Sequence, residues 1–368
     1  MASGPLTQLR KRRPEITHVA EPLSRIRSPM AWGVLTAGVA ILAALNLILG
    51  AFDVELSRVV GLLFDKAGID LGIEYSDREE AVVWVIRLPR MLTAALVGAG
   101  LGISGAALQG LFRNPLADPG LIGVSSGAAF AVALAVILGL NTLGLFALPL
   151  AAFAGGLILT LGIYAFARRG GRAQMATMLL VGIAVNALLA SAISFITSFS
   201  DDAQLRDIVF WLLGSLAGSV WNFVLAAGPL ILVAIVVLMR QAGALNLLTL
   251  GDAEARHLGL RVERSQLTIV TAAALATGAG VAVAGVIGFV GLIAPHIVRL
   301  ALGPDHRRLL PGSALAGAIL VLGADLGART IAAPAELPLG VLTAIIGTPV
   351  FLFLIDRARR SLALSGWQ

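Results

Sequence analysis

The sequence contains no cysteine and only two lysines, Lys11 and Lys66. Without cysteine, the chain has no disulfide framework, no thiolate metal site and no cysteine nucleophile. The histidines are scattered and predict no metal site; they are His18, His257, His296 and His306. A phosphate-binding loop needs a lysine at the end of a glycine-rich turn, and neither lysine lies in one. If ATP drives this protein, another chain must therefore bind the ATP and its magnesium.

Charged residues are also scarce. Only 13% of the 368 residues are charged, 58% are hydrophobic, and the mean hydropathy is +0.92. These values exclude a disordered chain, a coiled coil and almost any soluble enzyme, and they indicate an integral membrane protein. At roughly 20 residues for each span, this much apolar sequence predicts on the order of ten membrane-spanning helices. No Ser–His–Asp set, carboxylate pair or HExxH motif lies in a coherent position, so we expect no enzyme activity and no catalytic residues.

The apolar runs predict an all-α polytopic membrane protein. We expect spans near 30–51, 82–111, 120–140, 144–167, 173–198, 221–239, 266–286, 294–302, 310–332 and 338–355, and an amphipathic piece around Trp211. They divide the chain into a basic cytoplasmic tail (1–29), a transmembrane domain (30–358) and a cytoplasmic tail (359–368). The polar segment 52–80 carries eight acidic residues, and no role follows from its sequence.

Basic residues orient the chain. The net charge of +6 could suggest nucleic acid, but the basic residues of membrane proteins gather at cytoplasmic helix ends. A cytoplasmic start places 20 of the 27 Lys and Arg residues inside and seven outside. We therefore expect both termini in the cytoplasm, an even number of spans and no nucleic-acid partner. The run that begins near Met30 has about 21 residues, longer than the apolar part of a signal peptide, and predicts an uncleaved span.

The two halves of the chain hint at an internal repeat. Each half has a long span, a turn with glycine or proline and an arginine, and then a Gly/Ala-rich span. The turns are Arg113-Asn114-Pro115 and Pro295-His296 to Arg299. The units enter from opposite sides, so the repeat is inverted, which is typical of transporters; the alternative is that small residues are common in every helix bundle. His296 is interpreted as a structural hydrogen-bonding residue near a helix start.

The longest internal cytoplasmic loop, 240–264, has the pattern of two short helices separated by glycine. Asp252 is the candidate cap of a short helix, and Gly259 is its candidate end. Leu258 and Leu260 give the segment apolar side chains. This pattern favours a docking surface for a cytoplasmic partner, and the alternative is a solvated connector.

Polar residues on the outer side and in one span are candidate functional groups. Arg87, Arg90 and Arg329 lie outside, against the positive-inside bias, either as anchors or as partners of an acidic protein; Asp325 could also pair with Arg329. The polar groups of span 173–198 suggest either a wall facing a cavity or hydrogen bonds between helices. They are Asn186, Ser191, Ser194, Thr197 and Ser198.

Several ordered motifs together resemble one family, the FecCD-type membrane permeases of ABC importers for ferric siderophores, haem and vitamin B12. The resemblance covers about residues 30–358. The motifs are Arg87-Leu-Pro-Arg90, Gly98 to Gln109, Arg113 to Pro119, Gly123 to Ala128, Leu250 to Gly259, Gly288 to His296, Pro311-Gly312, Ala324-Asp325 and Glu336 to Gly340. The longer N-terminal tail and the extended 52–80 segment depart from the family pattern.

The resemblance implies a vitamin B12 permease-like subunit that works as a homodimer in a bacterial inner membrane, between two cytoplasmic ATPase subunits and a periplasmic binding protein. It assigns ATPase coupling to Gly251, Asp252, Ala255, Arg256, Leu258 and Gly259. It assigns binding-protein docking to Arg87, Arg90 and Arg329, and the translocation path to the polar residues of span 173–198. Structural roles fall to Arg113, Asn114, Pro115, Pro119, Gly123, Pro295, His296 and Asp325.

The cargo is expected to be an iron complex. The segment from Arg113 to Ala128 looks most like haem permeases, so haem is favoured, followed by ferric siderophore and then cobalamin. The chain itself is expected to bind no cofactor or metal. Two rival classes are an ion-coupled secondary transporter and an intramembrane enzyme. The first needs charged residues deep in its spans, where only Asp325 and Arg329 come near, and the second lacks a catalytic set.

Overall fold

The computed structural model describes residues 24–50, 52–169 and 172–364. Most of the predicted tail 1–29 and the end of the predicted tail 359–368 lie outside these residues. The long helices are α1 (Ser24–Ile48), α4 (Leu88–Phe112), α6 (Ala147–Phe166), α7 (Met175–Ser198), α9 (Trp221–Arg240), α12 (Val262–Ala284), α14 (His306–Thr330) and α15 (Leu339–Leu364).

Shorter elements connect or extend these helices. They are the α-helices α2 (Leu56–Lys66), α3 (Asp77–Glu80), α5 (Val124–Ile137), α8 (Asp202–Leu213), α10 (Ala242–Leu248), α11 (Asp252–His257) and α13 (Val290–Leu302). The π-helix η1 (Ala81–Arg87) joins α3 to α4, and η2 (Pro119–Ile122) and η3 (Leu140–Leu143) are 3-10 turns. Two short antiparallel strands, β1 (Arg168–Arg169) and β2 (Arg172–Ala173), pair with each other.

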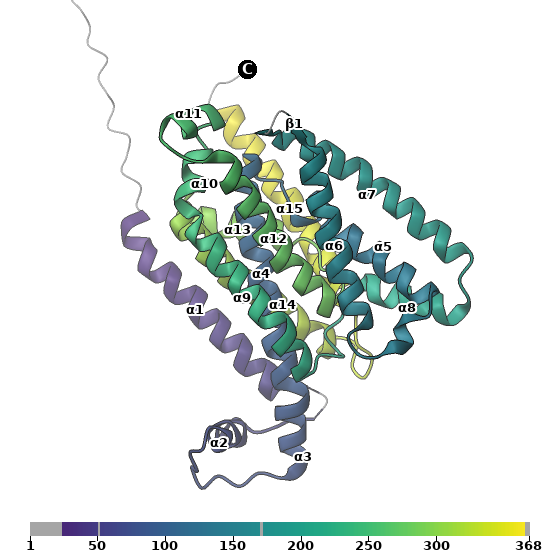
Figure 1. Ribbon diagram of the computed structural model, residues 1–368. Coiled ribbons are helices and arrows are strands. Elements are labelled where there is room, and N and C mark those ends of the chain that lie inside the picture. The colour runs from purple at the N-terminus through teal and green to yellow at the C-terminus, as the bar shows by residue number, and fades with distance from the viewer. Residues whose placement is uncertain (1–23, 51, 170–171, 365–368) are drawn as a thin grey trace, which may run out of the picture.

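The prediction of about ten spans is confirmed. Among the described residues, seven helices are long and apolar enough to cross a membrane, and three shorter apolar helices, in α5, α13 and α15, complete the set. The expected amphipathic piece around Trp211 is α8. α15 continues to Leu364, past the domain boundary expected at residue 358. In Figure 1, α10, α11, β1 and the last turns of α15 gather at one end of the bundle, and α2 and α3 lie at the other.

The bundle is built around α4. In the most apolar stretch of the continuous helix Asp77–Phe112, 78% of the residues are buried, and α12 and α14 follow at 72% and 67%. α4 and α14 touch through their backbones, because a Cβ atom placed on Gly98 would lie 2.3 Å from the carbonyl oxygen of Gly317. A Cβ on Gly102 would lie 2.1 Å from the carbonyl oxygen of Ser313. Small residues thus let the two helices approach as closely as backbones can.

α7 has few neighbours in its own chain. Only 6% of its most apolar stretch is buried, although its mean hydropathy of 2.3 is high enough for a membrane span. Figure 1 shows it along one flank, beyond α5 and α6. The chain therefore leaves one face of this helix open to lipid or to another protein.

The two shortest spans start in the same unusual way. α5 follows Gly123, which has φ +90°, and α13 follows Phe289, whose φ of +67° is rare for a residue with a side chain. Because α13 begins at Val290, Pro295 and His296 lie in its middle, so the expectation that they mark a helix start is wrong. The shared left-handed start fits two related halves, and the inverted repeat stays a prediction.

The polar segment 52–80 is folded, with α2 and α3 in it, and it continues into η1. Its helix α3 begins with a capping box, in which Ser76 and Glu79 bond each other's backbone N–H groups. Arg58 pairs with Glu79 at 2.6 Å. Trp221 of α9 donates its indole N–H to the carbonyl oxygen of Trp84, with the two rings 5.2 Å apart. The first two contacts stabilise the segment itself, and the last one holds η1, which follows it, against α9.

Candidate functional site

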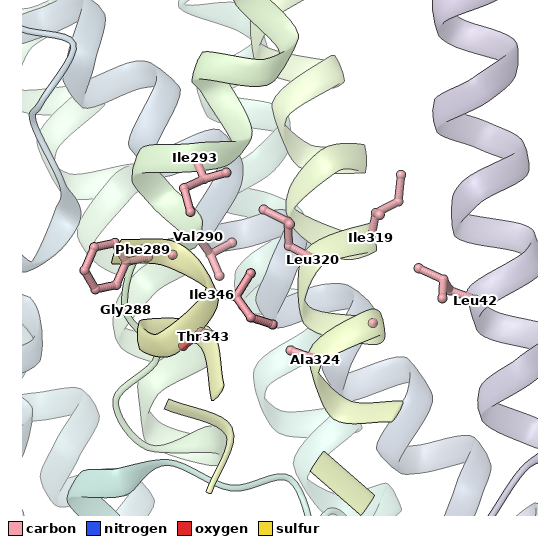
Figure 2. Close-up of a pocket in the computed structure, with 12 residues that line it drawn as sticks. Leu42, Gly288, Phe289, Val290, Ile293, Ile319, Leu320, Ala324, Thr343 and Ile346 are labelled. Carbon is pink, nitrogen blue, oxygen red and sulfur yellow. The ribbon is translucent and has the colours of Figure 1, made fainter. Parts of the chain in front are cut away.

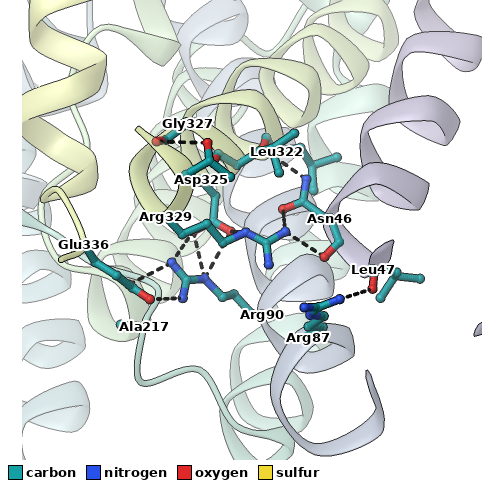
Figure 3. A network of polar contacts seen from close by, with 12 residues as sticks. Asn46, Leu47, Arg87, Arg90, Ala217, Leu322, Asp325, Gly327, Arg329 and Glu336 are labelled. Carbon is teal, nitrogen blue, oxygen red and sulfur yellow. Dashed lines mark hydrogen bonds and ion pairs between the residues drawn. The ribbon is translucent and has the colours of Figure 1, made fainter. Parts of the chain in front are cut away.

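Two polar regions lie at opposite ends of the bundle, and they are named outer and inner after the side of the membrane that the sequence predicts for each. The outer region centres on Arg90. This residue is 7% exposed, in the first turn of α4. Its Nε bonds both carboxylate oxygens of Asp325 at 3.0 and 3.1 Å. Its Nη1 and Nη2 bond both oxygens of Glu336 at 2.9 and 3.0 Å. Figure 3 shows the guanidinium between the two carboxylates, so Arg90 ties α4 to α14 and to the loop before α15.

The two other outer arginines hold the end of α1. Arg87 donates Nη1 to the carbonyl oxygens of Leu47 (2.8 Å) and Ile48 (2.7 Å). Arg329 donates Nη2 to the backbone oxygen of Asn46 (2.6 Å) and to its Oδ1 (3.0 Å). The last carbonyl groups of a helix have no partner within the helix, and a cation is favourable there. Arg87 and Arg329 therefore cap α1 from two neighbouring elements (Figure 3).

These contacts bury the three arginines for which the sequence left open a role as anchors or as partners of an acidic protein. Arg87 is 4% exposed, and the side chains of Arg90 and Arg329 are each 8% exposed. The physical reason is that each finds an acceptor inside the chain. The expected pairing of Asp325 with Arg329 is present but long, at 4.0 Å. Contact of these arginines with a binding protein stays a prediction.

The inner region is the segment made of α10 and α11, which forms the expected pair of short helices. Gly251 (φ +120°) is the N-cap of α11, and Asp252 is its first residue, so the expectation that the Asp252 side chain caps the helix is wrong. Gly259 (φ +86°) follows the helix end, as expected. Ala255 is fully buried against the bundle, whereas Leu250 and Leu258 are 60% and 61% exposed.

Ion pairs hold α11 to the bundle. Asp252 lies 3.6 Å from Arg113 and accepts a hydrogen bond from Gln266 of α12 at 3.1 Å. Arg256 bonds Glu263, also of α12, at 2.9 Å. The segment thus has a fixed inner face and an exposed outer face with two leucines.

The turn after α4 is shaped by the motif residues predicted to be structural. Arg113 ends α4 in the left-handed conformation, with φ +52°. Asn114 accepts a hydrogen bond from the Leu116 N–H at 2.9 Å, closing a local turn that holds Pro115. Pro119 is the first residue of η2, after Asp118, whose side chain accepts from the Gly120 N–H.

The polar groups of α7 separate into two sets. Asn186 faces its own chain: it donates to the carbonyl oxygen of Gly120 at 3.0 Å and accepts from Ser126 at 2.5 Å. Here the alternative of hydrogen bonds between elements is what the structure shows. The hydroxyl groups of Ser191, Ser194, Thr197 and Ser198 all donate to carbonyl oxygens of α7. All of these serines are exposed on one face, which leaves a stripe of small polar side chains uncovered.

The clearest internal hollow is apolar and does not fit a polar cargo. It has a volume of about 270 Å³ and lies between α1, α13, α14 and α15, with Leu42, Phe289 and Ile346 among its walls (Figure 2). Its one polar side chain, Thr343, donates to the carbonyl oxygen of Gly340. Among the described residues, no cluster of His, Cys, Asp or Glu could hold a metal ion. This hollow therefore offers no path for a polar cargo.

The fold and these two regions define a class: a membrane-embedded transport subunit with an anchored helical segment at one end. The chain belongs to the FecCD transport family, whose model matches residues 38–357, and it is the permease subunit of an ABC importer, without catalytic activity of its own. Permeases of this class work with an ATPase and a binding protein. The ordered motifs of the sequence therefore identified the family correctly.

Curated relatives and a solved structure agree. The chain is 48% identical over 281 residues to the hemin transport system permease protein HmuU of Yersinia pestis, covering 75% of this chain and 84% of the relative. It is 44% identical over 308 residues to the vitamin B12 import system permease protein BtuC of Shigella boydii, covering 83% and 93%. A metal-chelate type ABC transporter in an inward-facing conformation matches with a TM-score of 0.78 and 33% identity, covering 89% of this chain and 99% of that one.

Some residues of both regions were not predicted from the sequence. Asn46 lies in an apolar span and belongs to no local motif. Its side chain accepts a hydrogen bond from Arg329 and donates one to the carbonyl oxygen of Leu322. Glu336 was noted only as part of a motif. For Asn246 and Gln109, too, the sequence predicted no role. The available signal was a lone amide or carboxylate next to long apolar runs, where an unpaired polar group is costly.

Proposed function

We propose that two copies of this chain form the membrane pathway of a haem importer in a bacterial inner membrane, with both termini in the cytoplasm. A periplasmic binding protein delivers the cargo, and two cytoplasmic ATPase subunits drive it. The observation that carries this proposal is the pair of uncovered surfaces: the stripe of Ser191, Ser194 and Ser198 on α7, and the exposed leucines beside α11. A polar stripe on an open face of the chain suits a pathway that two copies line together, since the hollow between α1, α13, α14 and α15 is apolar.

The ATPase contact is proposed at α11. Leu250 and Leu258 stand exposed at its two ends, while Ala255, Asp252 and Arg256 face or pair with the bundle. Gly251 and Gly259 set the sharp turns that make α11 project. An apolar pair on a rigid base suits a partner's cleft, since hot spots of interfaces are buried anchors on preorganised elements.

The binding protein is proposed to engage Arg90 by carboxylate exchange. Glu336 is the one half-exposed member of the outer cluster, with 39% of its side chain exposed. A carboxylate of the binding protein can take the place of Glu336 on the guanidinium, while Arg87 and Arg329 keep α1 in position. Exchange predicts that Glu336→Gln strengthens docking, because the competing charge is gone. Unchanged affinity at low salt would contradict this assignment.

The cargo test uses the assembled system in liposomes. Haem, a ferric siderophore and cobalamin are each offered on a matching binding protein, and ATP hydrolysis and uptake are measured. Haem is expected to give the largest stimulation, supported by the identity to HmuU, while the similar identity to BtuC makes cobalamin the second candidate. Uptake by the purified chain alone along an ion gradient would overturn the importer mechanism in favour of a secondary transporter.

The dimer has its own test, because the chain is free of cysteine. Ser194→Cys on α7 is expected to cross-link two copies on oxidation. Ile158→Cys is the matched control: Ile158 is 71% exposed on α6 but lies outside the proposed interface. Equal cross-linking of both variants would indicate random collision rather than a dimer.

A further inference from the structure

One amide of α10 bonds the start of α14. Asn246 of α10 donates its Nδ2 to Asp305 at 2.7 Å. Its Oδ1 accepts from the backbone N–H of His306 at 3.0 Å and from His306 Nδ1 at 2.8 Å. Asp305 is the N-cap of α14 and accepts from the Arg307 N–H at 3.0 Å. Asn246 therefore grips the first turn of α14 through three hydrogen bonds.

The charge of Asp305 fits this arrangement. The Arg307 N–H and the Asn246 amide both bond its carboxylate, and they lower the pKa of Asp305 below its ordinary value. α10 itself is firmly seated, since Leu245 and Leu248 are 0% and 1% exposed. The hydrogen bonds of Asn246 thus join two helices, α10 and α14, rather than a loop and a helix.

The contact continues from α14 to α4. The His306 ring is 4% exposed, and a Cβ atom on Gly110 would lie 2.3 Å from its Nε2. The ring therefore fills the space that the missing side chain of Gly110 leaves at the inner end of α4. The buried ring therefore lies between Asn246 and the inner end of α4.

α4 and α14 then carry the contact across the membrane. Their antiparallel backbones touch at Gly102 with Ser313 and at Gly98 with Gly317. At the outer end the same two helices are joined by Arg90 and Asp325. We treat the pair as one stiff rod, since at these two points backbone meets backbone with no side chain between. One end of the rod meets Asn246, and the other carries the outer arginine cluster.

We propose that Asn246 is the positioning residue that passes movement of the ATPase-docking segment to the α4–α14 rod, and through it to the outer face. This inference rests on the proposed docking of the ATPase at α11. Asn246 does not touch cargo or nucleotide. Its role is to make α10, α14 and α4 move as one body, so that ATP hydrolysis and cargo release stay linked.

The test measures coupling in the full complex of permease, ATPase and binding protein in liposomes. The cargo is whichever of haem, ferric siderophore and cobalamin the wild type takes up best. Asn246→Ala is expected to keep ATPase binding and basal hydrolysis, while cargo taken up per ATP falls about fivefold or more, the usual size of coupling between sites. The matched control is Thr249→Ala. Thr249 is the C-cap of the same helix, α10, but its hydroxyl donates only to the carbonyl oxygen of Asn246.

A charge exchange gives a second arm in case Asn246→Ala fails to assemble. Asn246→Asp places two carboxylates together and is expected to uncouple; adding Asp305→Asn restores a donor–acceptor pair and is expected to recover uptake per ATP. An unchanged ratio in an assembled Asn246→Ala complex, or no recovery in the double variant, overturns the inference. Failure of the wild-type chain to bind the ATPase overturns the proposed function instead.

Discussion

The glycine contact between α4 and α14 gives the sharpest prediction. A Cβ atom on Gly102 would lie 2.1 Å from the carbonyl oxygen of Ser313 and 3.2 Å from the Cα of Gly317. Both neighbours are backbone, so no rotamer change can make room. In Gly102→Ala, α4 and α14 must separate by about 1 Å or more before the contact is an ordinary one. Every other contact along the two helices then loosens as well.

The size of the effect follows from two opposing terms. Forcing a methyl group into a packed site costs about 1–3 kcal/mol, and alanine regains up to ~1 kcal/mol of helix propensity. Gly102→Ala is expected to lower the free energy of unfolding by about 1–2 kcal/mol. Gly162→Ala on α6 is the matched control, since a Cβ there would meet nothing within 4 Å. It is expected to raise stability by about 0.5–1 kcal/mol.

The assay is unfolding of the detergent-solubilised chain by titration with sodium dodecyl sulfate, followed by helical circular dichroism. The same chemical change is expected to shift the midpoint in opposite directions at the two positions. If Gly102→Ala were as stable as Gly162→Ala, the backbone contact would not be the feature that holds α4 to α14. A loss of stability in both variants would point instead to a general intolerance of alanine at glycine positions.

Two further predictions concern ionisable groups. Asp325→Asn leaves the buried guanidinium groups of Arg90 and Arg329 without their shared carboxylate, and it is expected to lower the free energy of unfolding by about 3–5 kcal/mol in the same assay. Glu336→Gln removes a half-exposed partner and is expected to cost ~1 kcal/mol or less. Equal losses in the two variants would contradict this difference. The hydrogen bond to Asp65 raises the pKa of Tyr75 to about 12. In a Tyr164→Phe background, titration followed by absorbance should give this pKa for the remaining phenol. Asp65→Asn should return the pKa of Tyr75 toward 10. The stability that this bond contributes is present below about pH 10 and is lost as the pH rises through 12; a wild-type Tyr75 titrating near 10 would show that the bond is absent in solution.

Local sequence was sufficient for the spans. The run from Trp221 was expected to end at residue 239 and ends at Arg240, because a membrane span is set by the length of an apolar run, which is a local property. Gly259 was also correctly placed after a helix, since a left-handed C-terminal residue is a local signal. Chain orientation stays a prediction, and it rests on a count of charges that needs no knowledge of contacts.

Contacts between distant residues could not be predicted in this way. Arg90 and Asp325 are 235 positions apart, and Arg329 and Asn46 are 283 apart, so no local pattern shows that these arginines are neutralised inside the chain. The π-helix at 81–87 was missed because its single wider turn leaves the apolar pattern almost unchanged. α2 was missed because it lies within a segment whose many charges suggested a loop.

α7 has a consequence for how this protein is made. α7 is apolar enough to insert into the bilayer by itself, before any tertiary contact forms. Its packing against other helices is a separate and later event. In the proposed dimer, a newly synthesised copy therefore keeps this face of α7 against lipid until its partner docks. Assembly of the pathway then depends on the concentration of the chain in the membrane, whereas insertion of α7 does not.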